Sequence, residues 1–171
     1  MNALNKLCEY LISSGTTIAL AESCTGGLLS AMLVSYPGIS GVYLCGTVAY
    51  SNQAKISRLG VREEIIGAYG AVSEQCAEAM AEGAKNSIGS KIGLSTTGIA
   101  GPGGGSLQKP VGLVYVGISL PQGNFSYKLM LKGTRKEIME QAAGNARQAV
   151  RARARLPVRL AISPAKENNI K

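Results

Sequence analysis

The stretch Thr16–Gly27, TTIALAESCTGG, joins a short apolar run to an abrupt polar turn. Residues 17–21 are apolar or β-prone, four residues with polar or thiol side chains follow, and two glycines precede the apolar run that begins at Leu28. This order predicts a buried strand, a tight turn and a helix. Because the first N–H groups of a helix lack partners within it, they favour anions and developing oxyanions. The turn is therefore the first place to look for a functional site.

Helices and strands alternate outward from this stretch. Apolar residues at helical spacing predict helices over residues 2–14, 25–35, 53–59, 62–69 and 76–85, and from Thr134 towards Arg155. Apolar runs predict strands over residues 16–21, 42–49, 91–97, 111–119 and 125–131. The second run is continuous enough to predict a buried strand, and the last two form an antiparallel hairpin. The order predicts an α/β fold, a three-layer α/β/α sandwich with a mixed, mostly parallel sheet of about five strands.

The composition is that of one globular domain. The 171 residues are 46% hydrophobic, which excludes a disordered chain and is sufficient for a core. No apolar run approaches the roughly 18 residues of a membrane span. The N-terminus lacks a signal-peptide pattern, so we expect a cytoplasmic protein without membrane contact.

The four cysteines are widely spaced and form no C-x-x-C pair: Cys8, Cys24, Cys45 and Cys76. This spacing argues against a zinc site and against a disulfide framework. We expect Cys8, Cys45 and Cys76 to be small buried apolar residues.

The net charge of +8 is unevenly distributed. Residues 150–171 carry six basic side chains against Glu167, a balance of +5, which leaves +3 for the rest of the chain. A basic tail can touch nucleic acid, but the ordinary interpretation is a solvated helix end and a poorly ordered tail. We predict one domain over residues 1–155, a basic tail over residues 156–171, and no nucleic-acid partner.

Histidine and aspartate are absent from the sequence. Their absence excludes a Ser-His-Asp triad and any histidine-based metal site. If the protein is an enzyme, its proton-transfer groups must be Lys, Glu, Tyr or Cys. A lysine base beside a serine nucleophile is the natural candidate.

Three polar segments follow the ends of the first three predicted strands. They are residues 22–25, residues 50–52 with Lys55, and residues 96–98 with the glycine-rich loop that reaches Ser106. In open α/β sheets, ligands bind beyond the carboxyl ends of parallel strands. If the three strands are parallel, these segments converge on one site.

Each residue of these segments has two interpretations. Ser23 is a nucleophile or a cap of the following helix, and Thr25 competes with it for both roles. Lys55 is a partly buried lysine with a lowered pKa or an ordinary exposed one. The glycine-rich loop cradles a phosphate or carbonyl oxygen, or is a flexible turn, and it matches neither the P-loop nor the dinucleotide fingerprint.

Together the segments resemble a known family. The shared motifs are AESCTGG (Ala21–Gly27), VAYSNQAK with ISRLGV (Val48–Val61), GAVSE (Gly70–Glu74), and TGIAGPGGG with KPVG (Thr97–Gly105, Lys109–Gly112). They resemble, in order and spacing, the CinA C-terminal domain family of nicotinamide-nucleotide amidases, over about residues 5–150. The chain looks like the stand-alone form, without the molybdopterin-binding-like domain of fuller CinA proteins.

The resemblance implies an anticodon-binding-domain type of α/β/α sandwich, no metal and no cofactor. It implies hydrolysis of the carboxamide of nicotinamide mononucleotide to nicotinic acid mononucleotide and ammonia. Ser23 is then the expected nucleophile, Lys55 the expected base, and Tyr50 lies nearby. The expected substrate-binding residues, including oxyanion and phosphate donors, are Glu22, Thr25, Gly26, Gly27, Asn52, Thr97, Gly98, Gly101 and Arg135.

The sequence departs from the family at the last helix. Members commonly have a Gly-Asp-Arg run there and a second arginine four residues beyond the first, whereas this chain has Thr134 before Arg135 and Met139 at the second place. We expect a homodimer with a small nucleotide substrate. The alternatives are a non-catalytic nucleotide-binding module and a competence-associated protein that binds nucleic acid through residues 151–171.

Overall fold

Five strands form one sheet in the computed structural model, which describes residues 3–153. The strands are β1 (Ile18–Glu22), β2 (Tyr43–Val48), β3 (Ile92–Gly98), β4 (Leu113–Leu120) and β5 (Gly123–Met130). Their order is β2-β1-β3-β4-β5; β1 is parallel to β2 and β3, and β4 is antiparallel to β3 and β5. Of these five strands only β4 runs against the rest, so the prediction of a mixed, mostly parallel sheet is confirmed.

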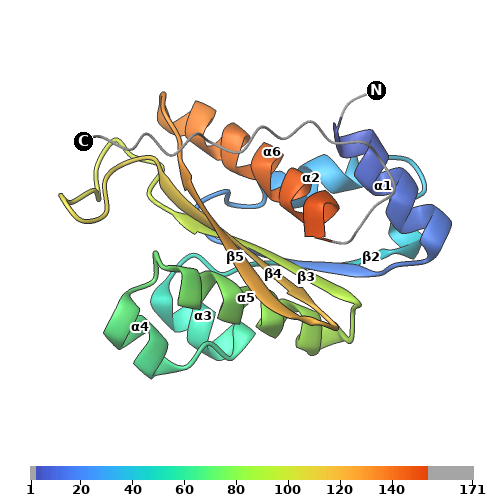
Figure 1. Ribbon diagram of the computed structural model, residues 1–171, viewed down its shortest axis with the longest axis horizontal. Helices are drawn as coiled ribbons and strands as arrows, with labels where there is room; N and C mark the ends of the chain where they lie inside the picture. The colour runs from blue at the N-terminus through green and yellow to red at the C-terminus, as the bar shows by residue number, and fades with distance from the viewer. Residues whose placement is uncertain (1–2, 154–171) are drawn as a thin grey trace, which may run out of the picture.

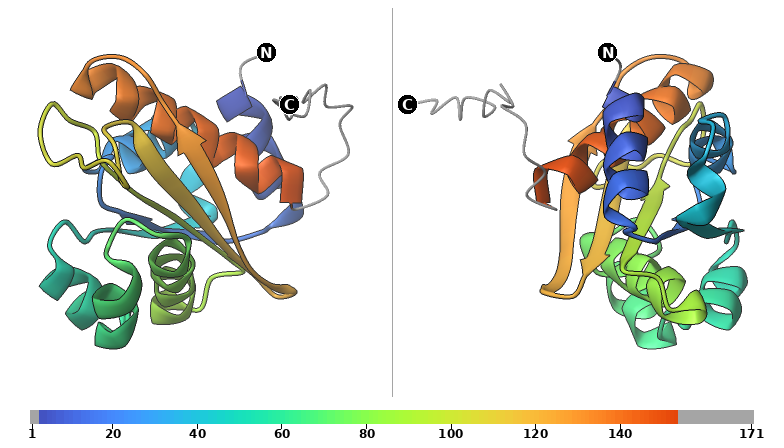
Figure 2. Two further views of the ribbon diagram at one scale, coloured as in Figure 1. Left: turned by 60° about the vertical axis from the view of Figure 1, so that its left-hand side comes forward. Right: turned by 90° about the vertical axis from the view of Figure 1, so that its right-hand side faces the viewer.

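Helices cover both faces of the sheet (Figures 1 and 2). One face carries α1 (Ala3–Ser14), α2 (Leu28–Val34) and α6 (Arg135–Arg153). The other carries α3 (Asn52–Leu59), α4 (Glu63–Tyr69) and α5 (Glu74–Ile88), while a 3-10 turn, η1 (Ile39–Gly41), leads into β2. The predicted three-layer sandwich is therefore confirmed.

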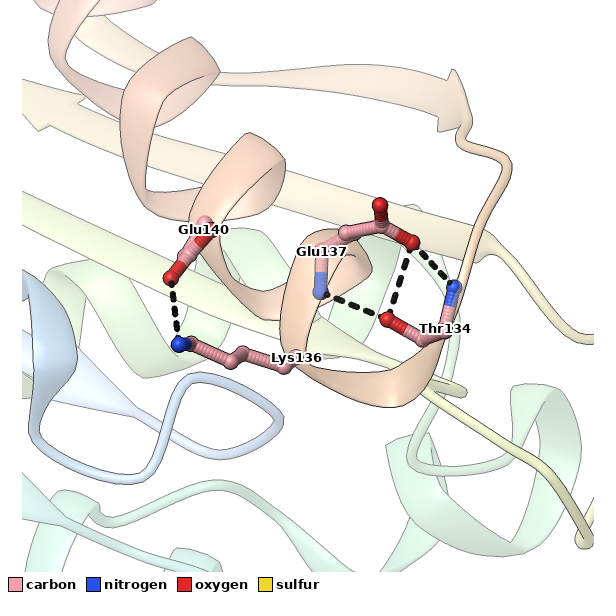
Figure 3. Close-up of polar contacts among 4 residues, drawn as sticks. All are labelled: Thr134, Lys136, Glu137 and Glu140. Carbon is pink, nitrogen blue, oxygen red and sulfur yellow. Dashed lines mark hydrogen bonds and ion pairs between the residues drawn. The ribbon is translucent and has the colours of Figure 1, made fainter.

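Hydroxyl side chains cap three of the helices. Ser73 Oγ accepts from Cys76 N–H at 3.2 Å before α5, and Ser51 Oγ accepts from Ala54 N–H at 3.0 Å before α3. At the start of α6, Thr134 N–H and Oγ donate to Glu137 Oε2 at 2.7 and 2.8 Å (Figure 3). In return, Glu137 N–H donates to Thr134 Oγ1 at 3.4 Å, so the two residues form a capping box, which fixes where α6 begins.

The start of α2 differs from the prediction of residue 25. Gly26 and Gly27 have φ values of 61° and 101°, so they form a left-handed turn rather than helix, and α2 begins only at Leu28. Residues 23–27 therefore form the connection between β1 and α2 and belong to neither element.

The core is divided by the sheet into two layers. Towards α1, α2 and α6 it contains Leu20 and Leu94, and towards α3 and α5 it contains Ala21 and Met80. Every residue of β1 is buried, as expected for the strand with a neighbour on each side and helices above and below. The strand that leads into the candidate site is thus rigidly packed.

The prediction that residues 42–49 form a buried strand is wrong. β2 is an edge strand, and Leu44 and Val48 on it are 41% and 50% exposed. Cys45 is likewise only half-buried, whereas Cys8 and Cys76 are buried as predicted. A continuous apolar run does not reveal strand order, and strand order decides how many neighbours cover a strand.

Two sequence-based predictions concern other features of the chain. The predicted tail over residues 156–171 lies outside the described residues. Across residues 3–153, no helix combines the length and the apolar character that crossing a bilayer requires.

Candidate active site

A cavity of about 270 Å³ lies beyond the carboxyl ends of β1 and β3 and beside the start of α3. Eight of the predicted site residues line it: Ser23, Tyr50, Asn52, Lys55, Thr97, Gly98, Gly101 and Arg135. Because β1, β2 and β3 are parallel, the segments that follow them meet at one edge of the sheet. The structure thus brings these eight residues together around one cavity.

Ser23 and Lys55 are in direct contact on the cavity wall. Lys55 Nζ lies 3.0 Å from Ser23 Oγ. The two remaining hydrogen-bond partners of Nζ are the carbonyl oxygens of Ala49 and Tyr50, each at 3.0 Å. As an ammonium, Nζ donates to all three oxygens. As a neutral amine it has two N–H donors and one lone pair, so with both donors on the carbonyls the lone pair would face the serine hydroxyl. This is the geometry of a nucleophile and its base.

Lys55 is 2% exposed, which is rare for a lysine. The cap formed by Ser51 starts α3 and places Lys55 in the first turn of that helix, facing inward. Burial lowers the pKa of the Lys55 ammonium below its usual 10.5, and the nearby thiols of Cys76 and Cys24 oppose this change. Burial therefore favours the neutral amine that a base requires.

Ser23 is held by the strand that it follows. Its N–H donates to the carbonyl of Thr96 at 2.9 Å, which continues the β1–β3 ladder by one residue. The Ser23 side chain is 8% exposed and lines the cavity. The hydroxyl is therefore fixed by the backbone and open to a ligand on one side.

Glu22 does not line the cavity. Its buried carboxylate accepts five hydrogen bonds of 2.6–3.0 Å, from the hydroxyls of Thr25 and Ser30 and the N–H groups of Gly27, Leu29 and Ser30. These N–H groups belong to the start of α2, where a negative charge is favourable. The Glu22 side chain thus anchors α2 on the face away from the cavity.

Thr25, Gly26 and Gly27 also lie outside the cavity. Thr25 is fully buried, its hydroxyl donates to Glu22 Oε2 at 2.6 Å, and it contacts Thr96 Oγ1 at 2.7 Å. Gly26 N–H donates to the carbonyl of Ser23 at 3.2 Å, and Gly27 N–H donates to Glu22 at 3.0 Å. The two glycine N–H groups therefore already have acceptors. All three residues line a neighbouring groove that shares Arg135 with the cavity.

The glycine-rich loop forms a second side of the cavity. Thr97 is buried and its hydroxyl donates to the carbonyl of Ala71 at 2.7 Å, so it ties two walls together. Ile99 N–H donates to the carbonyl of Leu113 at 2.9 Å. The N–H groups of Ala100 and Gly101 have no hydrogen-bond acceptor within residues 3–153. The N–H groups of Gly103 and Gly104, which also line the cavity, likewise have no acceptor among the described residues, so all four remain available to a ligand.

Arg135 closes the cavity from the start of α6. Its Nη1 donates to the carbonyl of Gly101 at 2.8 Å and its Nη2 donates to Tyr50 Oη at 3.0 Å. Arg135 and Lys55 are the two basic residues on the wall, and only Arg135 is exposed. An anionic group of a ligand would therefore be drawn to the Arg135 side.

Seven further residues line the wall: Cys24, Ala71, Val72, Ile99, Ala100, Gly103 and Gly104. Only Ala71 and Val72 lie outside the three polar segments of the sequence analysis; the other five belong to those segments without having been predicted individually. The small and apolar members carry no reactive group that could have marked them. Burial raises the pKa of the Cys24 thiol to about 12, so this cysteine stays protonated beside Ser23 and is a poor nucleophile. Within residues 3–153, no group of three or more acidic or cysteine side chains is placed to hold a metal ion.

Comparisons with known proteins agree on one family. The model of the CinA C-terminal domain matches residues 2–154. A CinA-like protein of Dictyoglomus turgidum is 55% identical over 131 residues, 76% of this chain and 32% of the relative. The chain thus spans about a third of the length of the curated relatives that it matches.

Solved structures have the same fold. The competence/damage inducible protein CihA from Agrobacterium tumefaciens is 36% identical, with a TM-score of 0.83 over 89% of this chain and 96% of that one. The competence damage-inducible protein A from Klebsiella pneumoniae is 29% identical, with a TM-score of 0.85 over 91% of this chain and 98% of that one. These likenesses extend over almost the whole described chain.

Proposed function

This chain belongs to the family of CinA C-terminal domains, and from that premise we propose that it is an amidohydrolase acting on nicotinamide mononucleotide. It hydrolyses the carboxamide to give nicotinic acid mononucleotide and ammonia. The observation that carries the proposal is the 3.0 Å contact between Lys55 Nζ and Ser23 Oγ on the wall of a cavity. A serine beside a buried, neutral lysine is an activated nucleophile, because the lysine takes the role of base that histidine has in other hydrolases.

The first half-reaction uses the lone pair of neutral Lys55. Ser23 Oγ forms a bond to the amide carbon while its proton passes to Lys55 Nζ. The carbonyl oxygen becomes an oxyanion, and the free N–H groups of Ala100 and Gly101 on the cavity wall are the donors that we assign to it. The C–N bond then breaks, and Lys55 returns its proton to the departing ammonia.

The second half-reaction releases the acid. Water replaces ammonia, gives a proton to Lys55 and attacks the acyl group on Ser23. The acyl–oxygen bond breaks, and Ser23 recovers the proton from Lys55. Atoms and protons balance over the two halves, and the base ends neutral.

We assign the phosphate of the substrate to the Arg135 side of the cavity. Arg135 is the exposed cation on the wall, its Nη2 donates to Tyr50 Oη at 3.0 Å, and Asn52 lines the same cavity. A planar guanidinium binds phosphate oxygens in pairs, which orients a ligand as well as attracting it. The amide end is then directed towards Ser23.

Two alternatives receive less support. Thr25 is a weaker candidate for the nucleophile than Ser23, because its hydroxyl is buried against Glu22 and Thr96, off the cavity. A non-catalytic nucleotide-binding module would have no use for a buried lysine at a serine hydroxyl, since burying that amine lowers stability. A third alternative, nucleic-acid binding through residues 151–171, depends on a stretch of which residues 154–171 lie outside the described part of the chain.

The test is ammonia release from nicotinamide mononucleotide by the purified chain in the presence of a chelator. We expect turnover that Ser23→Ala and Lys55→Met each reduce by about a thousandfold or more. Lys128→Met, at an exposed lysine on β5, is the matched control and should be fully active. Circular dichroism checks that each variant is folded. A folded wild type without turnover contradicts the proposal, and calorimetric binding of the nucleotide would then favour the binding module.

A further inference from the structure

Lys109 connects two walls of the cavity that are far apart in the sequence. Its ammonium donates to the carbonyl of Tyr69 at 2.5 Å. Because Tyr69 ends α4, its carbonyl lacks a partner within the helix, and a cation is favourable there. A Cβ added to Gly70, whose φ is 78°, would lie 2.8 Å from Lys109 Nζ. The ammonium therefore lies over the start of the wall formed by Ala71 and Val72.

The backbone of Lys109 belongs to the other wall, the glycine-rich loop. Its N–H donates to Ser106 Oγ at 3.0 Å, and its carbonyl accepts from Ser106 N–H at 2.8 Å. Two residues further on, Val111 packs against Gly101, where an added Cβ would lie 2.6 Å from Val111 Cγ1. Gly101 in turn lines the cavity and accepts from Arg135. The loop and α4 extend from the same end of the molecule (Figures 1 and 2).

Another side chain also bridges these walls. The hydroxyl of Thr97 donates to the carbonyl of Ala71 deeper in the cavity. Ser23 and Lys55 lie on other elements, and none of their hydrogen bonds within residues 3–153 involves Lys109. Loss of the Lys109 contact should therefore change the separation of the walls and leave the nucleophile and its base in place.

We propose that Lys109 is a positioning residue, which holds the Ala71–Val72 wall and the glycine-rich loop at the separation that the substrate needs. The effect of Lys109 on substrate kinetics rests on the proposed amidase function. Its effect on structure, a fixed spacing of the two walls, does not depend on that function. The two consequences are tested separately.

The kinetic test compares Lys109→Met with Lys109→Arg. The methionine variant removes the donor and keeps most of the side-chain volume, so the KM for nicotinamide mononucleotide should rise about tenfold, and kcat should change by less than about threefold. Lys109→Arg keeps a cationic donor and should restore most of the KM. Lys128→Met is again the matched control. An unchanged KM, a loss confined to kcat, or no rescue by arginine overturns the positioning role.

Hydrogen exchange tests the spacing without any substrate. Lys109→Met should speed amide exchange in residues 70–72 and 98–104, and leave exchange in β1 and α3 at the wild-type rate. If the wild type neither hydrolyses nor binds the nucleotide, the proposed function fails and the exchange data alone decide on Lys109. Unchanged exchange in both walls, or a uniform acceleration throughout the chain, overturns the inference.

Discussion

Lys55 Nζ lies 3.0 Å from Ser23 Oγ, although the two residues are 32 positions apart in the sequence. The carbonyl oxygens of Ala49 and Tyr50 accept the other two hydrogen bonds of the Lys55 amine. Under the proposed function, Lys55 therefore governs both the rate of hydrolysis and part of the pH dependence of the chain.

Hydrolysis should increase with pH through the lowered pKa of Lys55. Only the neutral amine accepts a proton, and burial brings the pKa of this group below 10.5. The logarithm of kcat/KM should therefore rise with a slope of about one below this pKa and reach a plateau above it. The measurement is kcat/KM between about pH 6 and pH 10. A profile that is flat or falls over the whole range would contradict a lysine base, and Lys55→Arg should be inactive throughout.

The same lysine should reduce stability at low and neutral pH. In the unfolded chain its pKa is about 10.5, so the unfolded state binds more protons than the folded state between the two pKa values. The free energy of unfolding should therefore increase as pH rises from the folded pKa towards 10.5. Urea unfolding of the wild type and of Lys55→Met isolates the contribution of this lysine. As pH rises, the free energy of unfolding of the wild type should increase relative to that of the variant. A decrease would contradict a lowered pKa of Lys55 in the folded chain.

Glu22→Gln should destabilise the chain and weaken activity, although Glu22 does not touch the cavity. The carboxylate accepts five hydrogen bonds, and an amide nitrogen in place of one oxygen would face N–H donors. We expect a loss of about 3 kcal/mol in urea unfolding. Glu82→Gln, at an exposed position within α5, is the control and should change stability by less than about 0.5 kcal/mol. Equal stability of both variants would show that the carboxylate charge is not needed.

Local chemistry predicts several of these features from the sequence. Ser73 and Thr134 stand just before amphipathic runs, and both are caps in the structure. The polar segments that follow three strands converge because parallel strands share one carboxyl edge. Such features depend on neighbours in the sequence, or on one rule of topology.

Other features depend on contacts that no local pattern contains. Lys55 sits in a short polar helix, and only the packing of α3 against α5 shows that it is buried. Gly26 and Gly27 turn the chain after Thr25, and N–H groups at the start of α2 donate to the Glu22 carboxylate. β2 is at the sheet edge because β3, and not β2, lies between β1 and the hairpin. Strand order and side-chain direction are long-range properties.

The capping box of α6 should contribute stability that acid removes (Figure 3). Hydrogen bonds from the N–H and hydroxyl of Thr134 lower the pKa of the Glu137 carboxyl below 4.5. Since the folded pKa is the lower one, this contribution is present above 4.5 and is lost as pH falls through the folded value. Thr134→Ala should cost about 1 kcal/mol at neutral pH and less in acid, by urea unfolding.

Glu140→Gln is the control for the capping box on the same helix. Glu140 forms an exposed ion pair with Lys136 at 3.9 Å, which contributes little to stability (Figure 3). A cost of Thr134→Ala that is no larger than that of Glu140→Gln, or that grows in acid, would contradict the role of the box.

Gly117→Ala should destabilise the chain strongly, because α5 packs on β4 at a distance that only glycine permits. A Cβ added at Gly117 would overlap the carbonyl of Ala77 in α5 and lie 2.6 Å from Ser95 Oγ, which itself donates to that carbonyl at 2.5 Å. Backbone and a short side chain cannot yield cheaply, so we expect a cost of about 3 kcal/mol in urea unfolding. The matched control is Gly67→Ala in α4, where an added Cβ meets nothing within 4 Å. Alanine there should be neutral or stabilise by up to about 1 kcal/mol, through better helix propensity. If both variants unfolded at the same urea concentration, the close approach of α5 to β4 at Gly117 would be contradicted.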